Sequence, residues 1–427
     1  MRTLLWFLAL FGIAVAIALF AGNNQGTITV FWPPHRIDLS LNLVLLLLVG
    51  FFFTLYVALR ALSVLLALPG EARRWRMSQR ERALQQGLLD ALAQLLAGRF
   101  IRARKSAESM LLQEQALARS DDPLPYGARL RSMAHLLAAE SAHALADRSG
   151  RDAHVRQVLN LKPSRDEADL IEGAQLRATR WALADRDVSA AFGLLSGLPK
   201  GIARRTLALR LRFKAERLAG HTQAALESAR LLAKHRAFSP LAAHSILQGL
   251  ARELIQGARD PAQLQQAWRQ LEVSEQITPE VATQAAQQML LLGGEVALAQ
   301  QWLMPVWAQM LQVTPSALSV AQRTELVQVL DRSFALSPDG PDAEWLVRIE
   351  AAQLRQPSDA LLQYLAGFAC LRLSLWGKAQ QLLRQSLGQL QSEPLKRQAW
   401  VALAQLAQQR ADPQAEIEAW RQAAKTG

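Results

Sequence analysis

Seven histidines and one cysteine are the side chains of this sequence best suited to binding metals or to catalysis. The histidines are His35, His135, His143, His154, His221, His235 and His244. His135 and His143 are eight residues apart in a segment of helical character, so they could line one helix face. Surface or packing roles are the alternative for all seven histidines, and Cys370 is expected to be a small core residue.

The sequence contains none of the motifs of a hydrolytic, redox or nucleotide-dependent site. It has no G-x-S-x-G, no P-loop, no H-E-x-x-H and no G-x-G-x-x-G turn. A single cysteine also excludes an intrachain disulfide and Cys-x-x-Cys motifs. The acidic pairs Asp121/Asp122 and Asp339/Asp342 adjoin prolines, which is typical of exposed turns. We therefore predict no catalytic residues, no metal site and no enzymatic activity.

A basic cluster lies in the segment RRWRMSQRER. Its five arginines are Arg73, Arg74, Arg76, Arg80 and Arg82. Near a membrane surface, such a cluster attracts anionic lipid at about 1 kcal/mol per residue. It could equally hold its flank of a membrane helix in the cytoplasm, and the two roles are compatible. The sequence shows no groove-reading helix or aromatic-interleaved sheet, so we expect no nucleic-acid partner.

Two uncharged apolar runs, residues 3–21 and 41–59, precede this cluster. At about 1.5 Å per residue, each could cross the roughly 30 Å hydrocarbon core of a bilayer as a helix. A cleaved signal peptide is the alternative for the first run. Between them, TITVFWPPHRIDLS favours extended backbone, and its proline pair ends any helix. We predict a two-helix transmembrane hairpin over residues 1–68, with a short loop at 22–40.

The arginine distribution predicts the orientation of this hairpin. Residues 1–82 hold eight arginines against three acidic residues, whereas the loop has only Arg36, balanced by Asp38. Cytoplasmic flanks of membrane helices are enriched in Lys and Arg. We therefore predict a two-pass protein with both termini in the cytoplasm and residues 69–82 as a basic juxtamembrane segment.

Residues 83–427 are predicted to be all-α, because Ala, Leu, Gln and Arg dominate them and leave almost no strand. A small or turn-forming residue followed five positions later by alanine recurs, first at Gly98. The alanines predicted to begin the packed face of a second helix are Ala103, Ala190, Ala224, Ala299 and Ala379. Ala190 and Ala224 are 34 residues apart, which is the tetratricopeptide period.

The best single copy of this repeat is YLAGFACLRLSLWGKAQQLLRQSL, residues 364–387. In it, Gly367 would permit close helix approach, Trp376 would fill the space between helices, and Ala379 would receive the neighbouring helix. We expect roughly eight or nine helix pairs in a tetratricopeptide-like α-solenoid over residues 83–427. The faces of such arrays bind helices or extended peptides.

The succession of a first span, GTITVFWPPHRIDLSLN, a second span and LRALSVLLALPGEARRWR resembles the amino-terminal region of the proteobacterial HemY family. The resemblance is strongest over residues 1–112. It implies a bacterial inner-membrane, tetratricopeptide-repeat protein associated with haem biosynthesis, with late enzymes of that pathway as partners. It also raises haem or porphyrin binding as a hypothesis, through an axial histidine or through arginines that meet propionates.

We therefore expect a membrane-anchored scaffold that organises late haem-pathway enzymes at the cytoplasmic face of the inner membrane. Two alternatives remain open. The first is an assembly chaperone for cytochromes or envelope proteins, which would need the repeats on the periplasmic side. The second is a porphyrin-pathway enzyme, which would have to turn over a porphyrinogen by itself. The sequence indicates no oligomeric state.

Overall fold

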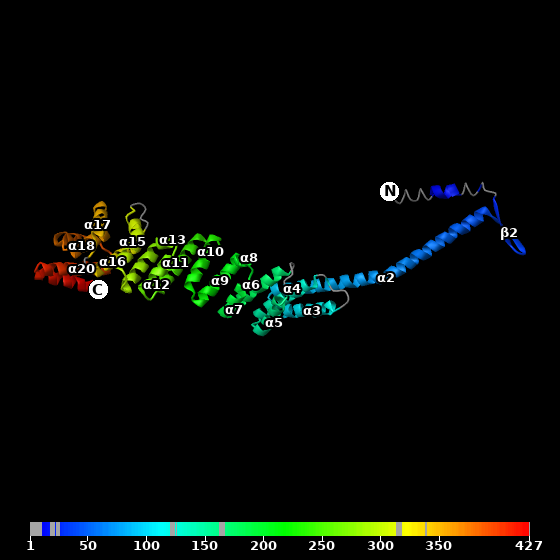
Figure 1. The fold of residues 1–427 in the computed structure, drawn as a ribbon, viewed down its shortest axis with the longest axis horizontal. Coiled ribbons are helices and arrows are strands. Elements are labelled where there is room, and N and C mark those ends of the chain that lie inside the picture. Colours follow the sequence, from blue (N-terminus) through cyan, green and yellow to red (C-terminus); the bar gives the residue numbers. More distant parts are fainter. Residues whose placement is uncertain are drawn as a thin grey trace. The chain divides into compact units, whose positions relative to one another are not determined.

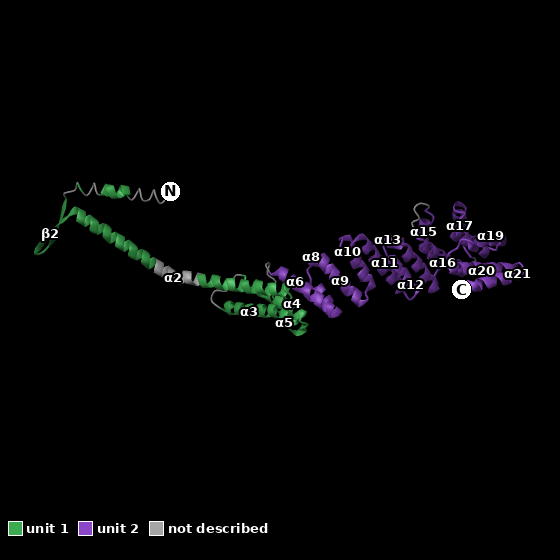
Figure 2. Ribbon diagram, turned by 180° about the vertical axis from the view of Figure 1, so that it is seen from behind, with its two compact units in different colours: residues 1–161 green, residues 162–427 purple. Residues whose placement is uncertain are grey.

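The computed structural model describes most of the chain: residues 11–17, 22, 26–119, 124, 126–161, 167–312, 318–337 and 340–426, without the side chains of residues 64–74. The chain divides into two compact units, Met1–Leu161 and Lys162–Gly427, which Figure 2 distinguishes by colour. The first unit combines a β-hairpin with helices, and the regular elements of the second unit are all helices.

In the first unit, helical residues 11–17 come before a β-hairpin (Figure 1). Its elements are β1 (Thr27–Trp32), β2 (His35–Ser40), α2 (Leu41–Leu96), α3 (Phe100–Ala118), α4 (Gly127–Ala144) and α5 (Arg148–Leu159). The strands pair antiparallel, from Thr27 opposite Ser40 to Trp32 opposite His35. Residues 27–32 and 35–40 of the loop predicted at 22–40 are thus paired strands. The β-branched residues of β1 favour the extended backbone, and the proline pair occupies the turn.

One uninterrupted helix, α2, extends over 56 residues. Ser40 caps its start by accepting a hydrogen bond of 3.3 Å from the backbone N–H of Leu43. The segment Leu41–Ser63 has 23 residues, a mean hydropathy of 2.4 and no buried residues. By length and composition it could cross a membrane, and it is the one such helix found among the described residues. The first predicted span, residues 3–21, lies largely outside those residues.

The basic segment at residues 69–82 is a direct extension of the apolar segment. The backbone is helical across residues 64–82, so the predicted boundaries after residues 68 and 82 both fall inside α2. No change of secondary structure marks them. The division into membrane hairpin, juxtamembrane segment and repeat domain therefore stays a prediction from composition.

The second unit is a series of paired helices. Its elements are α6 (Ala168–Ala184), α7 (Val188–Ser196), α8 (Lys200–Ala203), α9 (Thr206–Ala219), α10 (Thr222–Lys234), α11 (Pro240–Gln256), α12 (Pro261–Gln270), α13 (Val273–Gln276), α14 (Pro279–Leu291), α15 (Val296–Met310), α16 (Val320–Leu336), α17 (Ala343–Arg355), α18 (Ala360–Arg372), α19 (Trp376–Leu387), α20 (Glu393–Gln409) and α21 (Pro413–Lys425). The first helices of successive pairs contact one another, as α11 contacts α14 and α14 contacts α16. This is the contact pattern of a helical repeat.

A left-handed residue in the turn sets the register of the second helix in several pairs. Four of the nine positive-φ residues in the described chain follow this pattern: Gly98, Arg186, Gly220 and Ser374, with φ between 60° and 72°. The residue five positions after each is a fully buried alanine: Ala103, Ala191, Ala225 and Ala379 in turn. A left-handed residue ends one helix and redirects the chain, so the start of the next helix is counted from it.

Two of the predicted packing alanines lie one residue away from the buried position. Ala190 is exposed, and Ala191 is fully buried. The sequence prediction takes Asp185 as the turn residue and places the packed alanine five positions after it, whereas the left-handed turn residue is Arg186. The same shift leaves Ala224 only half-buried.

The other predicted packing residues, except Gly98, lie in or beside the core. Ala103, Ala299 and Ala379 are fully buried. Trp376 is half-buried and packs against the main hydrophobic core of the second unit. Gly98 is exposed and serves the turn rather than the helix contact, since nothing lies within 4 Å of a Cβ built there.

Gly367 lies where α18 and α19 approach most closely. A Cβ at this position would be 2.8 Å from Cγ of Leu383 and 3.1 Å from the Leu383 backbone nitrogen. We predict that Gly367→Ala destabilises the second unit by about 1–3 kcal/mol, because the added methyl group overpacks a closed contact. The measurement is denaturant unfolding of the detergent-solubilised chain.

Gly377→Ala is the matched control, since nothing lies within 4 Å of a Cβ at Gly377 in α19. We expect this variant to be as stable as the wild type or more stable by up to about 1 kcal/mol, as alanine favours helix over glycine. Equal destabilisation by both substitutions would contradict the close contact at Gly367.

Candidate functional site

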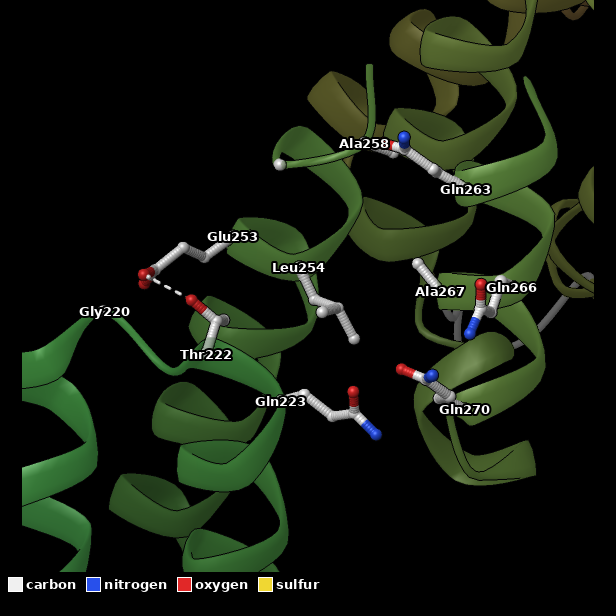
Figure 3. A pocket seen from close by; sticks show the side chains of 11 residues that line it. Gly220, Thr222, Gln223, Glu253, Leu254, Ala258, Gln263, Gln266, Ala267 and Gln270 are labelled. Atoms are coloured by element: carbon white, nitrogen blue, oxygen red, sulfur yellow. Dashed lines mark hydrogen bonds between the residues drawn. The ribbon is translucent and has the colours of Figure 1, made fainter. Parts of the chain in front are cut away.

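The second unit contains a groove between α10 and α12, with the last turn of α11 at its floor (Figure 3). Its volume is about 330 Å³. The lining residues are Gly220, Thr222, Gln223, Glu253, Leu254, Gly257, Ala258, Gln263, Gln266, Ala267 and Gln270. Carboxamide side chains and small apolar residues therefore dominate its surface.

Glutamines form both walls of this groove. Gln263, Gln266 and Gln270 are three and four residues apart, so they share one face of α12. Figure 3 shows Gln223 of α10 directed toward Gln270 from the opposite wall, with Leu254 between the two walls. Among the described residues, the carboxamides of Gln223, Gln266 and Gln270 have no hydrogen-bond partner within the chain.

The charges beside the glutamines are paired. Thr222 donates a hydrogen bond of 3.0 Å to Glu253, which also forms an ion pair with Arg217. The Arg217 guanidinium lowers the pKa of Glu253, so this carboxylate stays ionised and bonded to Arg217. Arg230 of α10 donates to Glu275 at 2.9 Å and to the backbone carbonyl of Gln270 at 3.0 Å. The groove therefore presents amides rather than free charge.

Histidines of the first unit lie between helices. His135 of α4 and His154 of α5 share a hydrogen bond, with 3.0 Å between their Nδ1 atoms. Burial lowers the pKa of His135 to about 4 and also lowers the pKa of His154, so both rings are neutral at pH 7. Nδ1 of His143, eight residues from His135, lies 3.5 Å from Arg151 instead. The two predicted helix-face histidines thus have different partners on α5.

The remaining candidate ligands are scattered. His221 stacks on Phe192 with ring centroids 5.9 Å apart, and His35 begins β2. His235 follows α10, and His244 lies exposed on α11. Cys370 is a fully buried free thiol, and burial raises its pKa. The part of the chain that the structure describes has no group of three His, Cys, Asp or Glu residues placed to hold a metal ion.

The basic cluster lies on α2, beyond its apolar segment. Arg76, Arg80 and Arg82 are exposed, and Trp75 beside them is 64% exposed. The side chains of Arg73 and Arg74 lie outside the described residues. Exposed guanidinium groups on one rigid helix can meet lipid phosphates or acidic proteins.

Residues 26–145 match the family model described as HemY protein N-terminus. These residues are similar to the HemY N-terminal region. This region starts at the β-hairpin, includes α2 with the apolar segment and the basic cluster, and ends one residue after α4. The resemblance predicted from the sequence is therefore confirmed, and the match extends beyond residue 112.

No protein with a curated description matches the whole chain or a part of it. Solved structures with some similarity include the APC/C hetero-tetramer Cut9–Hcn1, at 15% identity and a TM-score of 0.27, over 79% of this chain and 65% of that one. Naa15/Naa10 bound to HypK-THB has 11% identity and a TM-score of 0.24, over 77% and 56%. The P58(IPK) TPR domain has 13% identity and a TM-score of 0.23, over 77% and 99%. The repeat pattern of this chain rests on its own helix contacts.

The sequence analysis does not find the glutamine groove, which lies outside the HemY N-terminal region. Its signal is present in PAQLQQAWRQ, where three glutamines at helical spacing face one way. Glutamine is common on any solvated helix, so the spacing alone does not distinguish a groove from an ordinary surface. Gln223 on the facing wall lies 47 residues before Gln270 and faces it only in the folded chain.

A buried carboxyl group joins two successive repeats in the second unit. The Tyr364 hydroxyl of α18 donates a hydrogen bond of 2.8 Å to Asp331 of α16, whose other oxygen, Oδ1, has no partner within the described chain. Burial raises the pKa of Asp331 from about 3.8 to about 6. Folded protein therefore binds more protons than unfolded protein between these values, and the free energy of unfolding should fall as the pH rises from 4 to 6.

We predict that Asp331→Asn removes this pH dependence. The variant should gain stability relative to the wild type as the pH rises from 4 to 6, because the amide carries no charge to desolvate. Denaturant unfolding across this range measures the difference, with Asp169→Asn on the exposed face of α6 as the control. Parallel stability profiles for wild type and Asp331→Asn would contradict the assignment.

Proposed function

We propose that this protein is a membrane-anchored scaffold that binds late enzymes of haem biosynthesis at the cytoplasmic face of a bacterial inner membrane. The supporting observation is the combination of a HemY N-terminal region, a membrane-length apolar segment and paired helices in one chain. A further transmembrane helix at residues 3–21 would complete a two-pass anchor with both termini in the cytoplasm.

The anchor and the first repeat share a helix, and this continuity supports the proposal. α2 begins in the apolar segment Leu41–Ser63, includes the basic cluster, and ends in the pair that α3 completes. Proteins bound to the repeats would be held near the bilayer, which raises their effective concentration for one another. Porphyrin intermediates released by one enzyme would then meet the next enzyme at the same membrane surface.

The basic cluster supports the orientation and a contact with lipid. Three of its arginines are exposed on a helix that continues directly from the apolar segment. Each could gain about 1 kcal/mol from an anionic leaflet, and the cytoplasmic side is where such residues accumulate. The loop between the two apolar runs carries only Arg36, which lies 3.5 Å from Asp38 and is thereby balanced.

The side chains of the groove favour binding over catalysis. Its polar groups are mainly carboxamides, which do not exchange protons near neutral pH. Its carboxylate, Glu253, is occupied by Arg217 and Thr222 rather than being available as a general base. We therefore propose that the protein acts on haem synthesis by holding enzymes, with no reaction of its own.

The experiment is affinity capture of the intact chain from membranes, with residues 1–82 alone as the control anchor. We expect late haem-pathway enzymes to co-purify with the full chain and not with the anchor, because the repeats supply the binding surfaces.

Alkaline phosphatase fused after residue 427 should be inactive. Active phosphatase would support a periplasmic chaperone instead, and porphyrinogen turnover by the purified chain alone would support an enzyme. Either result would reject the scaffold.

A further inference from the structure

We propose that the groove between α10 and α12 binds an uncharged, extended segment of a partner protein through the main-chain amides of that segment. The inference rests on the proposed scaffold function and specifies the kind of partner surface that the scaffold would recognise. It is drawn from the free carboxamides on the two walls, the apolar floor and the paired charges beside them.

The glutamine side chains match the chemistry of a peptide backbone. Each carboxamide offers one carbonyl acceptor and an NH₂ group with two donors, so it can bond to both the C=O and the N–H of a peptide. Gln223 projects from one wall, and Gln266 and Gln270 project from the other. An extended chain presents N–H and C=O groups on both edges, with a rise of about 3.3 Å per residue. A segment lying between the walls could therefore bond to both.

The floor of the groove is apolar and shallow. Leu254 lies between the walls, and Ala258 and Ala267 flank it with single methyl groups. Gly257 adds no side chain. Alternate side chains of an extended segment point to opposite faces, so every second one would face this floor. Small apolar side chains would fit there, and main-chain bonds would supply the affinity while the floor supplies selectivity.

The charge pattern selects an uncharged segment. Glu253 forms an ion pair with Arg217 and accepts a hydrogen bond from Thr222, and Arg230 is bonded to Glu275 and to the Gln270 carbonyl. A charged side chain entering between the walls would lose water and find no free opposite charge. The same argument disfavours a free anion such as a porphyrin carboxylate as the occupant.

The probes are peptides selected from a phage-displayed library of random 12-residue peptides. The target of the selection is the full chain in lipid nanodiscs. We expect uncharged peptides to be enriched. The triple variant Gln223→Met, Gln266→Met and Gln270→Met should bind the synthetic peptides at least about tenfold more weakly, because methionine keeps the length and helix propensity but loses the amide hydrogen bonds. Peptides N-methylated at alternate residues should lose a similar factor, since they lack the donors on one edge.

A matched control replaces three exposed glutamines of α20, by Gln398→Met, Gln405→Met and Gln408→Met. This variant should bind the selected peptides as the wild type does. Any of four results would overturn the inference. Peptide binding could survive the groove substitutions, or N-methylated peptides could bind as well as unmodified ones. The selection could also enrich charged peptides, or enrich no peptides at all.

Enzyme capture by the groove variant separates this inference from the proposed function. If the scaffold acts through the groove, the triple variant should co-purify less of at least one haem-pathway enzyme than the α20 control does. Undiminished capture by the variant would reject the groove and leave the scaffold standing. An absence of captured enzymes with the wild type would reject the scaffold itself.

Discussion

The structure depends on the close approach of two helices at a residue too small to separate them. In several pairs the turn between the helices contains a left-handed residue, and the residue five positions later is a fully buried alanine. Protein interiors are packed too densely to absorb even one added methylene without strain. In the second unit, first helices of successive pairs contact one another, as α11, α14 and α16 do, so the array is built from contacts between neighbouring pairs.

Much of this array could be predicted from sequence because its contacts are local. Helix-forming composition, turn residues and buried alanines lie within a few positions of one another, and Gly367 was recognisable from its own repeat. The shift from Ala190 to Ala191 arose because the turn residue is Arg186, and an arginine gives no hint of a left-handed backbone. The strand His35–Ser40 alternates charged Arg36 and Asp38 with apolar neighbours, a pattern that is too short to separate from a loop.

The candidate site was less predictable, for a physical reason. The glutamine groove joins walls that are far apart in sequence, and the bond between Asp331 and Tyr364 connects two repeats. Both depend on how successive pairs pack rather than on any single segment. In contrast, the HemY N-terminal region was recognisable because its apolar run, proline turn and arginines follow each other directly.

The most direct test of the account compares two adjacent alanines of α10. Ala225 is fully buried five residues after Gly220, and Ala224 is half-buried beside it. The account predicts that Ala225→Leu lowers the free energy of unfolding by about 1–3 kcal/mol or more, through overpacking, and that Ala224→Leu changes it by less than about 0.5 kcal/mol. Equal losses of stability, or a larger loss for Ala224→Leu, would contradict the claim that the left-handed residue sets the helix register.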